Sequence, residues 1–234
     1  MPAGPEHASP AFAPTRWSLV LAARGADRSV ARVAIGELCR LYWYPLYGFA
    51  RRKGFSPHDA EDVTQEFFLT LVESNLLSTP DPARGRLRSF LLTAFQHDLE
   101  DARRASRRQK RGGGMELLPL DTTGAERLFQ LEPADPATPE AHFDRQWARA
   151  VLAGCLDHLR DQYATTGRAG AFEALRPFLN PDDAAGADYE TAAVALQLTP
   201  GAVRQAVHRL RERFAELLRS HIADTLENPT PAAR

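Results

Sequence analysis

The chain has 234 residues, of which 44% are apolar and 25% are charged, and its formal net charge is −1. This length accommodates one large domain or two small ones, and the charge balance excludes a molecule that is basic throughout. Two cysteines without metal-ligand spacing exclude a disulfide framework and a zinc-finger pattern. No apolar segment is close to the length of a membrane span, which needs about 20 residues. The first residues lack the basic start and the apolar segment of a signal peptide. We therefore expect a soluble, cytoplasmic protein.

The N-terminal part of the chain is predicted to be a disordered segment followed by helices. Residues 1–14 are rich in Pro and Ala, which is typical of disorder. Apolar residues then recur at helical spacing, with a short helix near Trp17, a break at 25–29 and a longer helix over 30–53. Pro45 lies inside the longer helix and predicts a kink or a break there.

The next predicted helix is rich in carboxylates. Ser56 can cap its N-terminus and Pro57 suits its first position. Its acidic side chains are Asp59, Glu61, Asp62 and Glu66. A first-turn carboxylate stabilises a helix by roughly 0.3–1 kcal/mol through the helix dipole, which accounts for Asp59 but not for Glu66, two turns further in. The cluster is therefore either a solvated face or a surface for a basic partner.

A loop over 75–85 separates this helix from one over 86–108, which is apolar at its start and basic at its end. Six of the nine residues from Arg103 to Arg111 are basic and none is acidic. Arg103, Arg104, Arg107 and Arg108 lie three and four residues apart and share a face. Such a run is either solvated surface or a set of phosphate contacts, whose strength falls steeply with salt.

The composition then changes. Residues 112–139 are rich in Gly, Pro, Asp and Thr and have little helical periodicity, which predicts a flexible linker. Helical spacing returns over 140–226, and a polar tail follows at 227–234. The sequence therefore predicts an all-α protein with two helical domains, over 15–111 and 140–226, joined by the linker.

The second domain ends in a pattern typical of a helix-turn-helix. A short helix over 189–196, capped by Asp188, is followed by Thr199-Pro200-Gly201, which begins a longer helix extending to about His221. Arg and Gln side chains on the second helix are suited to base edges and phosphates. The same spacing is compatible with an ordinary amphipathic helical hairpin.

Several stretches together resemble a known family. The run DAEDVTQEFF at 59–68, followed by RSFLLTAFQHDLEDARRASRR at 88–108, resembles region 2 of the sigma-70 family, and most of all its extracytoplasmic-function (ECF) group. The run ETAAVALQLTPGAVRQAVHRLRERFAELL at 190–218 is similar to region 4 of the same family. The stretches TRWSLV, LCRLYWYPLYGFARRKG and QKRGGG also resemble one subgroup of ECF sigma factors.

The resemblance implies a sigma factor that binds core RNA polymerase and directs promoter-specific initiation, with no catalysis and no cofactor. It implies that the acidic helix binds the polymerase through Asp59, Glu61, Asp62, Gln65 and Glu66. The minus-ten promoter element would be bound by Arg86, Arg88, Ser89, Phe90, Arg103, Arg104, Arg107 and Arg108. The minus-thirty-five element would be bound by Thr199, Ala202, Arg204, Gln205, His208, Arg209 and Arg211.

Two other functions are compatible with these features. The protein could be a helical adaptor that binds polymerase, or a helix-turn-helix regulator that binds DNA, and neither would direct initiation. The seven histidines are scattered, and no nucleophile elbow, phosphate-binding glycine loop or metal spacing is present, so an enzyme is not expected. Besides polymerase and promoter DNA, an anti-sigma factor or another protein regulator is a candidate partner, whereas a membrane and a small-molecule substrate are not expected.

Overall fold

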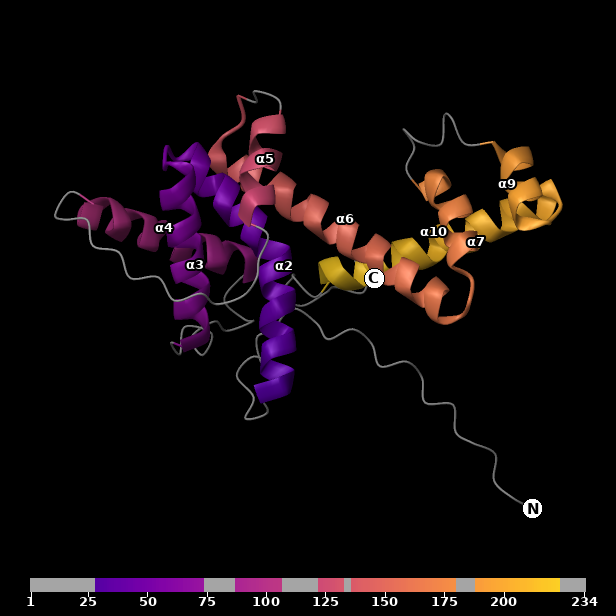
Figure 1. Ribbon diagram of the computed structural model, residues 1–234, viewed down its shortest axis with the longest axis horizontal. Helices are drawn as coiled ribbons and strands as arrows, with labels where there is room; N and C mark the ends of the chain where they lie inside the picture. Colours follow the sequence, from indigo (N-terminus) through magenta and orange to yellow (C-terminus); the bar gives the residue numbers. More distant parts are fainter. Residues whose placement is uncertain (1–27, 74–86, 107–121, 133–135, 180–187, 224–234) are drawn as a thin grey trace, which may run out of the picture.

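The computed structural model describes residues 28–73, 87–106, 122–132, 136–179 and 188–223, and these ranges are helical almost throughout (Figure 1). No strand occurs within them, which confirms the predicted all-α fold. None of the helices in these ranges is long and apolar enough to cross a membrane. The disordered segment predicted at 1–14, the loop at 75–85 and the tail at 227–234 lie outside the described residues.

Helix α2 (Arg28–Arg52) is the central helix of the first domain and continues through Pro45 without a break. Proline removes one backbone hydrogen bond from a helix, and complete burial of Tyr42, Leu46 and Phe49 holds the helix together around this position. The helix ends in a Schellman motif, in which Phe55 N–H donates to the Ala50 carbonyl and Gly54 adopts a φ of +92°.

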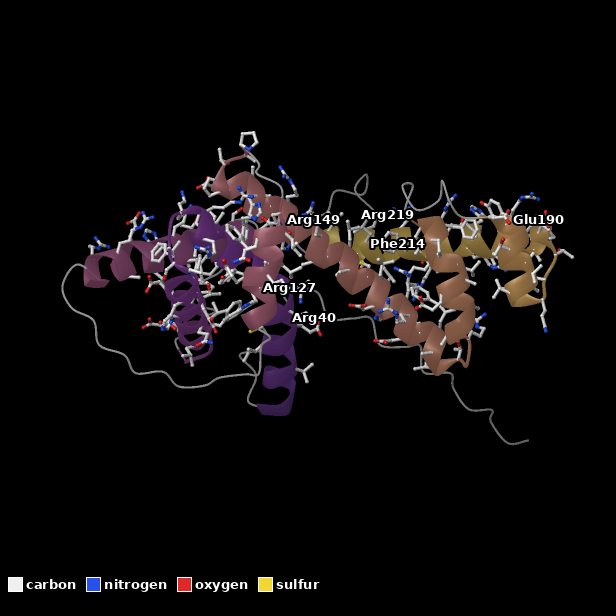
Figure 2. All side chains as sticks on the ribbon, turned by 45° about the horizontal axis from the view of Figure 1, so that its top comes forward. Arg40, Arg127, Arg149, Glu190, Phe214 and Arg219 are labelled. Carbon is white, nitrogen blue, oxygen red and sulfur yellow. The ribbon has the colours of Figure 1, made fainter. Side chains whose placement is uncertain are left out.

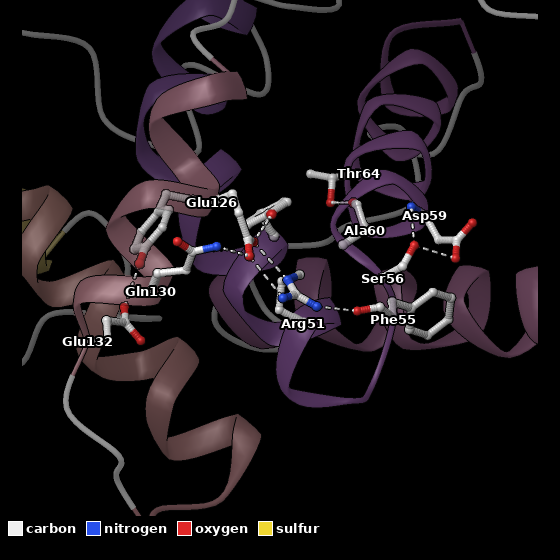
Figure 3. Close-up of polar contacts among 11 residues, drawn as sticks. Arg51, Phe55, Ser56, Asp59, Ala60, Thr64, Glu126, Gln130 and Glu132 are labelled. Atoms are coloured by element: carbon white, nitrogen blue, oxygen red, sulfur yellow. Dashed lines mark hydrogen bonds and ion pairs between the residues drawn. The ribbon is translucent and has the colours of Figure 1, made fainter.

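Helix α3 (Pro57–Glu73) begins where the sequence predicts. The Ser56 hydroxyl accepts a hydrogen bond from Asp59 N–H at 3.1 Å and donates one to the Asp59 carboxylate at 2.6 Å (Figure 3). This cap fixes the register of the helix, so that Ala60, Thr64 and Phe67 face the core and are fully or almost fully buried. Helix α4 (Leu87–Ser106) packs against α3.

The segment predicted to be a linker contains a helix, which corrects that expectation. Helix α5 (Thr122–Leu131) lies within 112–139 and contacts α2. The sequence pattern misses it because α5 has only 10 residues, too few to show a clear helical period. It is attached to α2 by Ala125 and Phe129, which pack on the first core, and by the ion pair between Glu126 and Arg51.

Helix α6 (Pro139–Thr165) is shared by the two cores, so the predicted boundary at residue 140 does not separate them. Thr138 caps this 27-residue helix by accepting a hydrogen bond from Ala141 N–H. Its first half contributes Phe143, Trp147 and Val151 to the core formed by α2, α3 and α4, and Cys155, just past the midpoint, belongs to the same core. Its second half contributes Leu159 to a second core.

The second core is built from the C-terminal helices. These are α7 (Ala169–Leu175), the short 3-10 helix η3 (Arg176–Leu179), α9 (Tyr189–Leu196) and α10 (Pro200–Ala223). The buried members of this core are Leu159, Phe172, Leu175, Phe178, Ala192, Ala193, Val203, Val207 and Leu210. Phe214 and Leu217 of α10 pack against both cores, and Phe214 lies at the junction of the two halves in Figure 2.

Candidate binding surfaces

The acidic face of α3 is available to a partner. Asp59, Asp62 and Glu66 are exposed, whereas Glu61 and Gln65 are half-buried beside them. Along α3, these polar residues alternate with buried ones at helical spacing, so the carboxylates lie on the side of the helix that faces away from the core. All five residues predicted to bind polymerase therefore lie on one short, capped helix.

The carboxylates of this face contribute to the pKa shifts of two neighbouring residues. Burial and, secondarily, the Glu66 carboxylate raise the pKa of Asp98 on α4 above its ordinary value. A backbone hydrogen bond and the Asp62 carboxylate, 3.1 Å from the His58 ring, raise the pKa of His58. The acidic surface thus extends from α3 onto α4, which increases the attraction for a basic partner.

The residues predicted for minus-ten DNA are in several different environments. Ser89 is exposed and Phe90 is half-buried against the first core. Arg88 is engaged with Asp144 and Trp147 of α6, at 3.0 Å from the carboxylate and 4.6 Å from the ring centroid. Arg86, Arg107 and Arg108 lie outside the described residues.

The two described arginines at the end of α4 have partners within the molecule. Arg103 donates to the Lys53 carbonyl, and its guanidinium lies 5.1 Å from the centroid of the Phe55 ring. Arg104 forms an ion pair with Asp101 at 2.6 Å. Both side chains remain exposed. Their exposure leaves them accessible to phosphates, while their contacts fix the end of α4 on the turn between α2 and α3.

The α9–α10 pair has the short connection that the sequence predicts. Asp188 caps α9 by accepting hydrogen bonds from Glu190 N–H and Thr191 N–H. Gln197 adopts a left-handed φ of 54°, which turns the chain sharply after α9. Thr199 then caps α10 by accepting a hydrogen bond from Ala202 N–H at 3.2 Å.

The solvent-facing side of α10 holds most of the residues predicted to bind minus-thirty-five DNA. Arg204, Gln205, His208 and Arg209 are exposed, and Ala202 is half-buried. Arg204 stacks over Tyr189 of α9 at 5.4 Å, which limits the conformations that its side chain adopts. His208 lies 3.4 Å from Glu212, one turn further along.

Arg211, further along α10, is hydrogen-bonded to the backbone of the second core. Its Nε and Nη2 atoms both donate to the backbone carbonyl of Phe178, at 3.0 and 2.8 Å. Phe178 is buried in the second core. Arg211 therefore joins α10 to the end of η3.

Three glutamates form a clamp on the basic end of α2 that the sequence analysis missed. We call Glu126, Glu132 and Glu140 the glutamate clamp. Glu126 accepts hydrogen bonds from Arg51 at 2.9 and 3.0 Å and from Tyr47 (Figure 3). The Arg51 hydrogen bond is the main reason that the pKa of Glu126 is below its ordinary value. Glu140 forms an ion pair with Lys53 at 2.9 Å.

Glu132 is the most enclosed member of the clamp. Its side chain is only 10% exposed and lies near Tyr44, Arg52, His142 and Gln146. Burial and the hydrogen bond to Glu132 raise the pKa of Tyr44. The only signal in the sequence was charge complementarity between the run Arg51-Arg52-Lys53 and acids inside the predicted linker.

The described ranges contain no group of three or more His, Cys, Asp or Glu side chains that could hold a metal ion. Both cysteines are buried, and burial raises the pKa of Cys39 to about 12. A thiol with such a pKa is protonated at neutral pH and is a poor nucleophile.

Comparison with known proteins finds a match for the segment that contains the acidic face of α3. Residues 40–109, which include α3, α4 and the C-terminal part of α2, match the family model of sigma-70 region 2. This segment is similar to sigma-70 region 2, in agreement with the resemblance of the sequence motifs in the acidic helix and the helix that follows it.

A curated sigma-70 relative extends the similarity to most of the chain. It is the ECF RNA polymerase sigma factor SigE of Mycolicibacterium smegmatis, which is 28% identical over 192 residues. The match covers 82% of this chain and 64% of the relative, so the chain spans just under two thirds of that relative's length. No solved structure matches the chain. Both comparisons support the resemblance to ECF-type sigma-70 proteins that the sequence motifs indicate.

Proposed function

We propose that this protein is an ECF-type sigma factor that binds core RNA polymerase in the cytoplasm and directs promoter-specific transcription initiation. The observation that carries the proposal is the exposed acidic face of α3, within the segment that matches sigma-70 region 2. In this proposal the chain acts by binding and positioning, and it requires no cofactor and performs no catalysis.

Polymerase binding is assigned to α3. Asp59, Asp62 and Glu66 are exposed on a helix whose start is fixed by the Ser56 cap. A preformed carboxylate surface favours fast encounter with a basic partner and loses affinity as salt is raised. Glu61 and Gln65, which are half-buried at its edge, would complete the contact.

Promoter binding is divided between the two domains. The start of α4, with Arg88, Ser89 and Phe90, and the exposed arginines at its end are assigned to the minus-ten element. The first turns of α10, with Arg204, Gln205, His208 and Arg209, are assigned to the minus-thirty-five element, because the N-terminal part of a recognition helix reaches base edges in the major groove. Arg211 is assigned a positioning role, because its guanidinium is bonded to the Phe178 carbonyl.

In vitro transcription tests this function. The purified chain is added to core polymerase from the same organism, with fragments of that organism's genome as templates, and transcript starts are sequenced. A sigma factor produces starts at a defined set of sites that share upstream elements, and these starts are absent with core polymerase alone. If the chain binds core polymerase or DNA without producing such starts, it is an adaptor or a helix-turn-helix regulator and the proposal is wrong.

A further inference from the structure

Arg88 near the start of α4 is covered by the first half of α6. Its Nε lies 3.0 Å from Asp144 Oδ1, and its guanidinium carbon lies 4.6 Å from the centroid of the Trp147 ring. Only 18% of the Arg88 side chain is exposed, whereas 54% of the Asp144 side chain is. Arg88 thus has one anionic oxygen and one aromatic face as partners.

These two partners are of the kinds that a single nucleic-acid strand offers. A strand presents phosphate oxygens, which form charge-assisted hydrogen bonds with guanidinium groups, and base faces, on which arginine stacks. Asp144 and Trp147 supply an equivalent pair from within the chain. A strand and α6 therefore cannot both occupy the same face of the Arg88 guanidinium.

The cover is held in place by contacts along the first half of α6 and along α5. Phe143 is fully buried and meets the Phe49 ring edge-on, with centroids 6.4 Å apart. The glutamate clamp adds ion pairs from Arg51, Arg52 and Lys53. The Arg88–Asp144 pair itself is partly exposed, so salt screens it, and a strand with a higher density of negative charge can compete for Arg88.

We propose that Asp144 and Trp147 of α6 form an autoinhibitory cover, in which they occupy Arg88 in the free protein, and that Arg88 exchanges them for a strand when promoter DNA binds. The inference rests on the proposed function, since Arg88 is one of the residues assigned to the minus-ten element. Phe143 and Val151 keep this half of α6 in the first core, so the Arg88 guanidinium changes partners while the helix stays in place.

The test measures how tightly the free, full-length protein binds a fluorescein-labelled single-stranded DNA of mixed sequence. Asp144→Asn removes the carboxylate charge from Arg88 while keeping the shape of the side chain. Asp161→Asn is the matched control, because it is exposed on the same helix and makes the same change in net charge. Each substitution is also made together with Arg88→Ala, and circular dichroism verifies the helical content of all variants.

We expect Asp144→Asn to bind the strand about two- to fivefold more tightly than Asp161→Asn at low salt, the range of one partly exposed ion pair. Arg88→Ala should abolish this difference. The proposal is overturned if the two asparagine variants bind equally, or not at all, or if the gain persists without Arg88.

Failure of the cover and failure of the proposed function give different results. The wild-type and Asp144→Asn proteins are also tested for transcription with core polymerase on genomic fragments. Promoter-specific starts together with equal strand binding reject the cover and keep the sigma-factor assignment. A gain in strand binding that depends on Arg88, without any such starts, supports covering of a nucleic-acid surface and rejects initiation.

Discussion

Arg211 on α10 donates two hydrogen bonds to the backbone carbonyl of Phe178, at 3.0 and 2.8 Å, and so ties the recognition-helix candidate to the end of η3. A carbonyl that loses a charged donor near a core is costly to leave unpaired. This side chain therefore adds to the apolar contacts of Val203, Val207 and Leu210 that hold α10 on the second core.

Arg211→Ala should destabilise the second domain. We expect the free energy of unfolding, measured by urea denaturation, to fall by about 1–2 kcal/mol, which is typical of a partly exposed hydrogen bond to a charged group. Arg213→Ala is the control, because Arg213 forms a surface ion pair with Glu216, and it should change stability by less than about 0.5 kcal/mol. Equal effects of the two substitutions would show that the Phe178 contact contributes nothing measurable.

Charge reversal on α3 should weaken polymerase binding without unfolding the protein. We expect Asp62→Lys together with Glu66→Lys to lower affinity for core polymerase at least about tenfold at low salt, because like charges across an interface are repulsive. Asp161→Lys with Glu190→Lys makes the same charge change on exposed residues of the second half of the chain, and Glu190 is labelled in Figure 2. Affinity is measured by labelled-protein titration. An unchanged affinity of the α3 variant, with normal helicity, would reject α3 as the contact.

Substitutions early in α10 should alter promoter choice. Loss of one side chain that reads a base edge costs about 1–3 kcal/mol at one base pair, so Arg204→Ala or Gln205→Ala should relax selection at one upstream position. Arg211→Ala should lower transcription from all promoters alike, since it acts through the fold. The measurement is transcription from a library with a randomised upstream element. If all three variants keep the same preferred sequence, these residues do not read bases.

The Glu126–Arg51 contact should stabilise the protein at neutral pH and less so in acid. Since the hydrogen bond from Arg51 lowers the pKa of Glu126 below 4.5, its ordinary value, the contribution is complete above that pH and is lost as pH falls through the lower folded-state pKa. Glu126→Gln should therefore reduce the free energy of unfolding by about 1–2 kcal/mol at pH 7, and the difference from wild type should shrink below about pH 4.

A second glutamate serves as the control for this pH dependence. Glu37 forms an i,i+3 ion pair with Arg40, and the two side chains are 42% and 52% exposed. Glu37→Gln should change stability by less than about 0.5 kcal/mol at pH 7. A difference for Glu126→Gln that is constant from pH 7 to pH 3 would mean that the substitution acts through packing and not through the carboxylate charge.

Local signals in the sequence predicted the parts of the structure that depend on local interactions. The caps at Ser56, Asp188 and Thr199 act over two or three residues and are present as expected. Helix α5 and its contacts were missed because Glu126 meets Arg51 across 75 residues and Glu132 meets Tyr44 across 88. No spacing rule in a single sequence identifies pairs at such separations.

The candidate sites likewise contain features that the sequence could predict and features that it could not. Exposure of Asp62, Glu66 and Gln205 follows from helical periodicity, so the sequence could predict which face each occupies. The internal partners of Arg88 and Arg211 come from distant segments, α6 and η3. Arginine suits phosphates, carboxylates and carbonyls equally well, so residue type alone did not distinguish a DNA contact from a contact within the fold.

The sharing of α6 between two cores limits how this protein can be divided or recombined. A cut at the end of the region 2 match, residue 109, would remove Phe143 and Trp147 from the core that contains Phe49. Chimaeras joined there would expose a fresh apolar surface on the donated domain. Exchange of domains with similar proteins should therefore succeed only when the first half of α6 is transferred together with the N-terminal part, so the two halves of the chain must be inherited together.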